Sequence, residues 1–319
     1  MKKAAPAASM PVQSKSGRLW IRIKQQKWML LMMLPAFLCL LMFCYIPLSG
    51  WYLAFSDYEI GGSLFSGKFV GLKYFIKIFR DSSDLSYLLR NTLVINCSSL
   101  ILNIVLAMVF AVLLNEMRWK KGAKLVQTVS FFPYFVSWVI AYSVVWSMFA
   151  VKSGVINQFL VRIGALEKGL NILGDPKYSW GLIITLNVWK NIGYNTIIFL
   201  AAIAGISGEQ YEAAALDGAS RLQRIWFVTI PNLLPTLSVL LIMNSGWILN
   251  SGLEQFFIFS NSTNWSRMEV LDMYIYKFGL KMLDFPYSTA MSIIKTIVSI
   301  ALLLTVNWIT KKISKSAVI

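Results

Sequence analysis

The chain has 319 residues, 57% of them hydrophobic, and the apolar residues gather in blocks long enough to cross a bilayer, which excludes an ordinary water-soluble domain. Its formal net charge of +16 lies mainly in short segments between those blocks, a pattern typical of membrane topology and not of a nucleic-acid-binding surface. No histidine is present, so His-based hydrolytic triads and zincin-type metal sites are excluded as well.

The apolar blocks predict an all-α, polytopic membrane protein with six transmembrane helices. A spanning helix needs about 20 mostly apolar residues, and each block reaches that length. The first block contains Pro35 and Pro47, so we expect it to be broken or kinked there. The predicted spans are residues 28–49, 92–114, 125–149, 181–206, 232–259 and 287–309, within one membrane domain of residues 28–310.

The distribution of basic residues predicts the orientation. An even number of spans places both termini on one side of the membrane. The short loop of residues 115–124, on that same side, carries Arg118, Lys120, Lys121 and Lys124. Because loops rich in Lys and Arg stay in the cytoplasm, we predict cytoplasmic tails at residues 1–27 and 311–319.

The cytoplasmic loop of residues 207–231 is predicted to fold as two short helices. Gly218 falls between them, where a left-handed residue ends the first helix. Pro231 is expected to end the second helix and to start the fifth span. Each helix begins with a capping-box spacing, Ser207 with Gln210 and Ser220 with Gln223.

A longer pattern runs through this loop. Glu212, Ala213 and Ala214 are followed by three residues, Gly218, nine further residues and then Val228-Thr229-Ile230-Pro231. This run resembles the EAA signature of binding-protein-dependent import permeases, E-A-A-x3-G-x9-I-x-L-P, with Val for Ile and Ile for Leu. The segment YEAAALDGAS is similar to the corresponding segment of carbohydrate-importer permeases of the maltose type. Resemblance to their polysaccharide/oligosaccharide branch covers about residues 28–312 and is carried by Asn115-Glu116, Phe132-Pro133, Ser137-Trp138, Trp189-Lys190, Gly193-Tyr194 and Glu254-Gln255.

The resemblance implies a type I ABC importer permease in a bacterial cell membrane. It implies a second homologous permease as heterodimer partner, two cytoplasmic ATP-binding subunits and an extracytoplasmic solute-binding protein. The loop would be the coupling helix that docks on an ATPase subunit. The chain has no G-x-x-x-x-G-K-[ST] loop, so we expect no catalytic residue, metal or cofactor on it, and ATP with Mg²⁺ on the partner ATPase. The implied coupling residues are Glu212, Ala213, Ala214, Asp217, Gly218 and Pro231.

Polar and aromatic residues follow one face of several predicted spans. The faces are Asn96, Ser99 and Asn103; Trp138, Tyr142, Trp146 and Phe149; Asn187, Lys190, Asn191 and Tyr194; Asn244, Trp247, Ser251 and Glu254; and Ser288, Ser292, Lys295 and Ser299. Such a mixture suits a sugar, because hydroxyls need many donors and acceptors and pyranose faces rest on aromatic rings. The candidate substrate path for an oligosaccharide or polysaccharide fragment is therefore Lys190, Asn187, Tyr194, Trp138, Tyr142, Asn244, Trp247, Ser251, Glu254 and Lys295.

Other interpretations stay open. Polar residues also hold transmembrane helices together, and Trp or Tyr form interfacial belts. Each intramembrane charge costs about 2.5–3.5 kcal/mol near a helix centre, so Glu254 pairs with Lys190 or Lys295, or the lysines meet the carboxylates of an acidic saccharide. For the whole chain, the alternative is an ion-coupled secondary transporter of a polar solute, for which Glu254 is the one suitable carboxylate.

Overall fold

The computed structural model describes residues 26–80 and 82–314, and the predicted tails lie largely outside these residues. The chain divides between Tyr52 and Leu53 into two compact units, each of which is described by itself.

The first unit is one apolar helical stretch. It begins with α2 (Lys27–Leu40), continues as a π-helical turn (Leu41–Tyr45) and then as a 3-10 segment (Ile46–Phe55). The stretch continues through both Pro35 and Pro47 without a break, and the change from α-helical to π and 3-10 geometry lies next to Pro47. The wider π turn directly before Pro47 relieves the clash between the proline ring and the carbonyl four residues earlier.

The second unit is helical apart from a short antiparallel pair of strands, β1 (Ser56–Asp57) and β2 (Lys68–Phe69), in which Ser56 lies opposite Phe69. Two further π-helical turns occur at Ile225–Thr229 and Lys277–Lys281, and a 3-10 turn at Phe132–Phe135. The α-helices are α3 (Lys73–Arg80), α4 (Ser82–Glu116), α5 (Lys120–Phe131), α6 (Trp138–Phe149), α7 (Val155–Arg162), α8 (Pro176–Ala204), α9 (Gly208–Leu216), α10 (Arg221–Arg224), α11 (Ile230–Ser245), α12 (Leu253–Phe259), α13 (Trp265–Met268), α14 (Leu271–Tyr276) and α15 (Phe285–Ser314).

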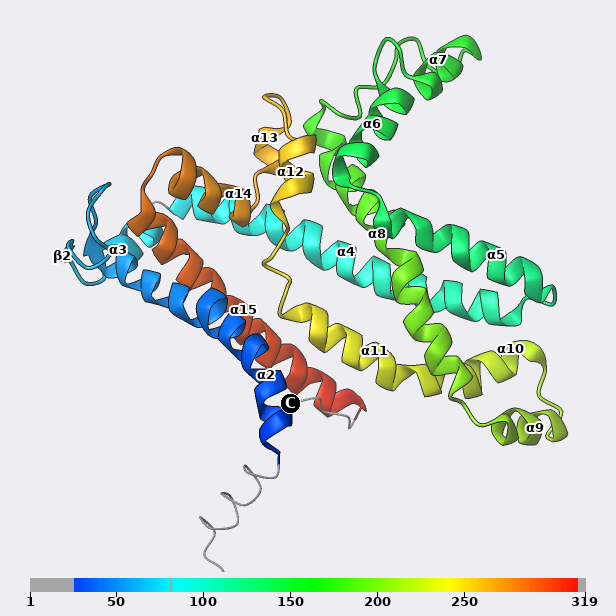
Figure 1. Cartoon of the computed structure of the whole chain (residues 1–319). Helices are drawn as coiled ribbons and strands as arrows, with labels where there is room; N and C mark the ends of the chain where they lie inside the picture. The colour runs from blue at the N-terminus through cyan, green and yellow to red at the C-terminus, as the bar shows by residue number, and fades with distance from the viewer. Residues whose placement is uncertain (1–25, 81, 315–319) are drawn as a thin grey trace, which may run out of the picture. The chain divides into compact units, whose positions relative to one another are not determined.

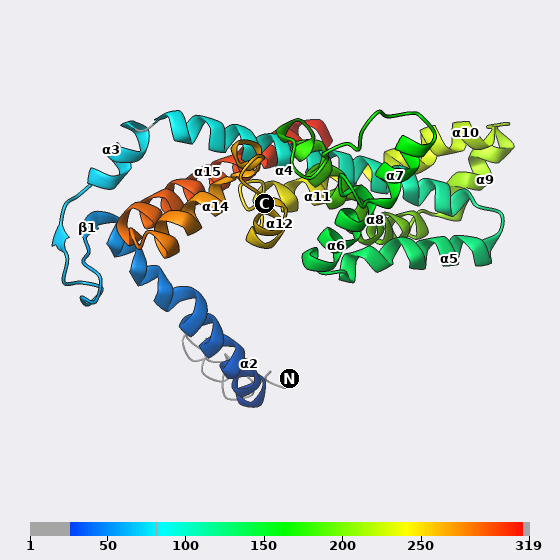
Figure 2. The ribbon, with the colours of Figure 1, turned by 90° about the horizontal axis from the view of Figure 1, so that it is seen from above.

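Long helices dominate this unit, and α4 packs along α8 (Figure 1). Figures 1 and 2 both show α9 and α10 near the loop that joins α4 to α5, with α14 toward the opposite end of α4. Four helical segments of the described chain are long and apolar enough to span a membrane, and six if each of two bent helix pairs is one span. The predicted fold class, an all-α polytopic membrane protein, is confirmed.

The third predicted span, residues 125–149, is not one straight helix. Lys120–Phe135 and Trp138–Phe149 meet at an angle of 106°. Val136 and Ser137 between them are extended, and the Ser137 hydroxyl caps α6 by accepting from the Ile140 amide. The apolar block concealed this bend because three of the four residues from Phe132 to Phe135 are aromatic and continue the hydrophobic run.

The fifth predicted span, residues 232–259, is helical only up to Ser245 and again from Leu253. Gly246 ends α11, and Gly252, whose φ is +72°, precedes α12. The predicted interruption at these two glycines is therefore present, but Asn244, Trp247, Ser251 and Glu254 do not share a helical face.

Pro231 does not separate the loop of residues 207–231, called the coupling loop from here on, from the fifth span. The helix is continuous from Arg221 to Ser245, through the π turn Ile225–Thr229. Pro231 lies in the first turn of α11, where its missing N–H costs little, and the π turn stands in the same position relative to it as Leu41–Tyr45 does to Pro47.

Two apolar clusters flank a polar zone along α4 and α8. One contains Ile95, Ile183 and Leu186 together with Phe256 and Phe259. The other packs α4, α8 and α11 through Ile104, Ala107, Ala111, Phe199, Ile203, Leu233 and Leu240. The segments of α4 and α8 between these clusters carry the asparagines described next.

Candidate functional site

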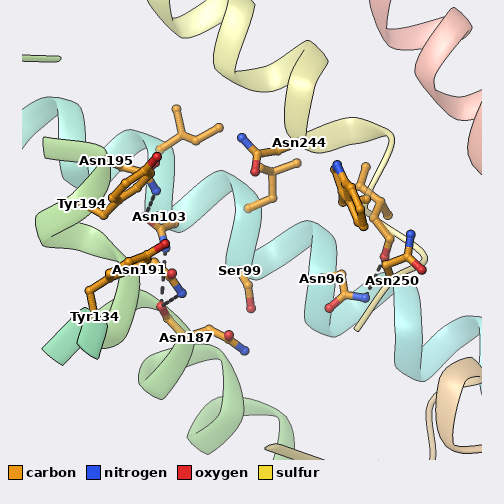
Figure 3. A pocket seen from close by; sticks show the side chains of 14 residues that line it. Asn96, Ser99, Asn103, Tyr134, Asn187, Asn191, Tyr194, Asn195, Asn244 and Asn250 are labelled. Carbon is orange, nitrogen blue, oxygen red and sulfur yellow. Dashed lines mark hydrogen bonds between the residues drawn. The ribbon is translucent and has the colours of Figure 1, made fainter. Parts of the chain in front are cut away.

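A polar cavity of about 300 Å³ lies among α4, α8, the bend before α6 and the end of α11 (Figure 3). Seven of its fourteen lining residues are asparagines, and none is charged. It is lined by Asn96, Ser99, Leu100, Asn103, Ile104, Tyr134, Asn187, Asn191, Tyr194, Asn195, Asn244, Trp247, Ile248 and Asn250.

Hydrogen bonds from α8 to α4 and within α8 hold part of this amide lining in place. Asn195 Nδ2 donates to Asn103 Oδ1 over 2.7 Å, and Asn191 Nδ2 donates to the Asn187 carbonyl over 2.9 Å. Each amide has two N–H groups and two acceptor lone pairs, so these bonds leave capacity for a ligand. The cavity is therefore an array of neutral donors and acceptors.

An aromatic wall closes one side. The rings of Tyr134 and Tyr194 stack with centroids 4.8 Å apart, and Figure 3 shows both at the cavity. Gly193 lets the end of α5 lie close to α8, because a Cβ at this position would lie 2.7 Å from the Phe131 Cα. The predicted path residues Asn187, Tyr194, Asn244 and Trp247 thus line one cavity with Tyr134, which was not predicted.

Lys190 and Glu254 face a second cavity of about 300 Å³, which Trp138, Asn187 and Ser251 also line. The Lys190 ammonium donates to the Val136 carbonyl and, over 3.1 Å, to the Tyr134 carbonyl. These carbonyls are freed by the bend between α5 and α6, so Lys190 stabilises that bend. Among the described residues Glu254 forms no salt bridge.

Lys295 has a partner that was not predicted. Its ammonium binds Asp272 Oδ1, while Asp272 Oδ2 accepts from the Ser251 amide over 2.7 Å. Asn96 Nδ2 donates to the Ser251 hydroxyl over 2.7 Å from the other side. These contacts hold the non-helical segment between α11 and α12. Lys295 thus pairs with Asp272 and not with Glu254.

Two aromatic residues of the predicted path contact the apolar core. The rings of Trp138 and Tyr142 both meet Phe259 edge-on, at centroid distances of 6.4 and 5.1 Å. Trp138 also borders the cavity of Lys190, whereas Tyr142 is not among the residues that line that cavity or the amide-lined one.

The loop of residues 207–231 carries the predicted coupling residues. Glu212 and Ala213 are exposed on α9, and Asp217 ends that helix. Gly218 follows with φ +78°, so it is the left-handed residue between the two helices. The Ser220–Gln223 capping box is present in both directions. The Ser207 hydroxyl caps α9 through the Glu209 amide.

The loop is tied to two spanning helices. Gln210 Oε1 accepts from Asn232 in α11 and so is engaged outside the predicted box with Ser207. Arg221 Nη2 bonds to Glu116, the last residue of α4, through its side-chain Oε2 at 2.6 Å and its carbonyl at 2.9 Å. Movement of the loop would therefore be transmitted to the helices that line the amide cavity.

Comparison with known proteins identifies this combination. The family model described as "Binding-protein-dependent transport system inner membrane component" matches residues 28–318. Protein LplB of Bacillus subtilis is 37% identical over 297 residues, which are 93% of this chain and 92% of LplB. The polygalacturonan/rhamnogalacturonan transport system permease protein YteP of the same organism is 37% identical over 316 residues, 98% of each chain.

A solved structure has the same fold. In the crystal structure of a bacterial alginate ABC transporter in complex with an alginate pentasaccharide-bound periplasmic protein, one chain superimposes with a TM-score of 0.85 at 32% identity. The match covers 94% of this chain and 100% of that one.

Proposed function

Because the chain belongs to the family of inner-membrane components of binding-protein-dependent transport systems, we propose that it forms half of the translocation path for an oligosaccharide that carries carboxylate groups. ATP hydrolysis on a separate subunit would drive the transport.

The amide-lined cavity is the observation that carries the proposal. A transport path requires many modest contacts in place of one tight site, and seven asparagines offer such contacts to sugar hydroxyls. Tyr134, Tyr194 and Trp247 add aromatic surface for the apolar faces of sugar rings. The cavity has no charge of its own, so it can pass a saccharide without holding it by an ion pair.

The relatives support the substrate class. YteP is named for polygalacturonan and rhamnogalacturonan, and the solved relative for alginate, described as an acidic polysaccharide. Both names refer to chains that contain uronic acids. We therefore propose a uronate-containing oligosaccharide as the cargo of this chain.

The proposal includes an assembly and an orientation. A second permease would complete the path, two ATP-binding subunits would dock on the coupling loops, and a solute-binding protein would deliver the cargo from outside. Both termini would be cytoplasmic, because the loop beside the basic residues 118–124 contacts the coupling loop through Glu116 and Arg221.

Purification and reconstitution test this proposal. A tagged chain, purified in mild detergent, should retain a P-loop ATPase and a second permease. In proteoliposomes with loaded binding protein and internal ATP, the complex should import oligogalacturonate. A chain that is purified alone and transports without ATP would overturn the proposal in favour of secondary transport.

The cavity itself is tested by Asn244→Leu, which removes an amide at its wall. Loss of one neutral hydrogen bond predicts that KM for uptake rises about two- to tenfold, with assembly unchanged. Met243→Leu is the matched control, because Met243 is 61% exposed and lies outside the lining. Equal uptake by both variants would contradict a role of the cavity in transport.

A further inference from the structure

Two arginines share one tryptophan ring at the end of α4 and α8 that is remote from the coupling loop. The Arg267 guanidinium lies 4.4 Å from the centroid of the Trp180 ring, and the Arg90 guanidinium lies 5.7 Å from it. Arg267 belongs to α13, Arg90 to α4 and Trp180 to α8, so three elements meet at this point.

Among the described residues, neither guanidinium has a carboxylate partner. Within residues 26–80 and 82–314, the salt bridges and side-chain hydrogen bonds include none made by Arg90 or Arg267. Contact with an indole stabilises a cation by only about 0.5–1 kcal/mol at an exposed site. Two like charges brought to one ring, with ten N–H donors between them and no anion, are suited to bind one.

The surrounding backbone is held rigidly, so the two charges are not brought together by a mobile loop. The Trp180 indole N–H donates to the Arg267 carbonyl over 2.9 Å. Asn91, which is 0% exposed, donates to the carbonyls of Ser266 and Glu269, each over 3.0 Å, on both sides of Arg267. A preorganised pair of donors loses little entropy when it binds a ligand.

The position of this pair relates it to the transport path. Trp180 lies seven residues before Asn187 on α8, which is two helical turns, or about 10 Å, along nearly the same face. Arg90 lies near the start of α4, whereas Glu116 at its end contacts the coupling loop. With that loop in the cytoplasm, the two arginines are at the extracytoplasmic end, where cargo enters.

We propose that Arg90 and Arg267, on the Trp180 ring, bind a carboxylate of the incoming saccharide at the entrance to the path. The proposal rests on the proposed function above and deepens it by assigning selection of acidic cargo to these residues. Arginine suits this role because its planar fork pairs with both oxygens of a carboxylate, and the paired charge attracts anions over a distance. No bond is made or broken in this step.

The test uses the assembled complex in proteoliposomes and two cargoes, oligogalacturonate and its fully methyl-esterified, uncharged form. Arg90→Gln and Arg267→Gln should each raise KM for the acidic cargo about two- to fivefold, as loss of one exposed ion pair does, and leave the neutral cargo unchanged. Arg267→Lys should retain part of the preference. Arg162→Gln, at an exposed position of α7, is the matched control and should change uptake of neither cargo.

Salt dependence and docking of the binding protein show whether the bound carboxylate belongs to the saccharide or to the binding protein. Raising the salt concentration should weaken uptake of the acidic cargo in the wild type and less so in the double Gln variant. If the variants lower uptake of both cargoes equally, or weaken docking of the binding protein whatever its cargo, the proposal is overturned. If the wild type imports neither cargo, the proposed function fails; if it imports both and the Gln variants behave like it, only the arginine site fails.

Discussion

Two segments between spanning helices differ in how far their apolar side chains are exposed. In the coupling loop, Leu216 is 90% exposed and Leu222 is 70% exposed. In α13 and α14 and the link between them, Met268, Val270 and Leu271 are at most 2% exposed. Both segments are short, helical and mixed in composition, so composition alone does not distinguish them.

The difference indicates what each segment is for. Exposed leucines next to charged residues mark a surface that is completed by a partner, which supports docking of an ATPase subunit on the coupling loop. Buried apolar side chains mark a segment that belongs to the protein's own core. We therefore expect substitutions of buried residues in the α13–α14 segment to change stability and substitutions in the coupling loop to change transport.

Asp272→Ala should have the largest effect, and it should act on stability. The side chains of Asp272 and Lys295 are 16% and 12% exposed, so the change leaves a largely buried ammonium without its partner and frees the Ser251 amide. Breaking such a pair costs about 3–5 kcal/mol. Thermal unfolding of the purified complex measures it.

Two further variants show whether the cost belongs to the unpaired charge. Asp272→Asn combined with Lys295→Met should recover most of the lost stability, because both charges are removed. Lys281→Met, at an exposed position, should leave Tm unchanged. An Asp272→Ala complex as stable as the wild type would show that this segment is not part of the core.

Gly218→Val should abolish transport while the complex still assembles in the membrane. The φ of +78° costs a residue with a Cβ about 1–2 kcal/mol, and a β-branched residue more, so the angle between α9 and α10 should change. No atom lies within 4 Å of a Cβ added at Gly218, so backbone strain is the sole cause. Uptake and the yield of intact complex are the measurements.

Two substitutions test that cause. Gly218→Asn should retain much of the uptake, because asparagine tolerates the left-handed region. Gly208→Ala, in the same loop with open space and no positive φ, should behave like the wild type. Normal uptake by Gly218→Val would refute the coupling role of the loop.

Arg221→Gln should lower transport only in part, and it tests whether the coupling loop acts on transport more than on stability. The pair with Glu116 has side chains 50% and 31% exposed, so its loss should cost only about 0.2–1 kcal/mol of stability. Because the pair joins the loop to α4, transport per ATP hydrolysed should fall further than Tm does. The exchange Glu116→Arg with Arg221→Glu should restore coupling in part; equal losses of Tm and coupling would count against this role.

Much of the fold was predictable because bilayer thickness makes spanning helices visible as apolar blocks. The turn chemistry of the coupling loop was predictable too, since Ser220, Gln223 and Gly218 act through local backbone geometry. The 106° bend was not predictable, because its cause is tertiary. Lys190 supplies donors to the carbonyls freed there, and Gly193 gives α5 room beside α8.

The site was predictable where residues lie on one helix and not where distant segments meet. Asn187 and Tyr194 share a face of α8, so their periodicity placed them together. Asp272 was not predicted, because it lies in a segment whose sequence predicts an external loop. Its contact with Lys295 joins residues 23 positions apart. The Arg90, Trp180 and Arg267 cluster likewise has no local signal.

Asp57→Asn should have the smallest effect, and it tests whether burial determines how much a charge pair contributes to stability. Asp57 lies outside the spans, and hydrogen bonds from Lys73, at 2.7 and 2.9 Å, and then from Tyr74 lower the pKa of its carboxyl. A carboxyl whose pKa is lowered in the folded state stabilises the fold at every pH above its ordinary pKa of 3.8. This contribution is lost as the pH falls from 3.8 through the lower pKa of the folded state. The wild-type and Asp57→Asn complexes should therefore unfold at nearly the same Tm from about pH 5 to 8, since the pair is exposed and solvent-screened. A large loss of Tm at neutral pH would mean that charge pairs contribute to stability irrespective of burial, and the contrast drawn from Asp272 would then fail.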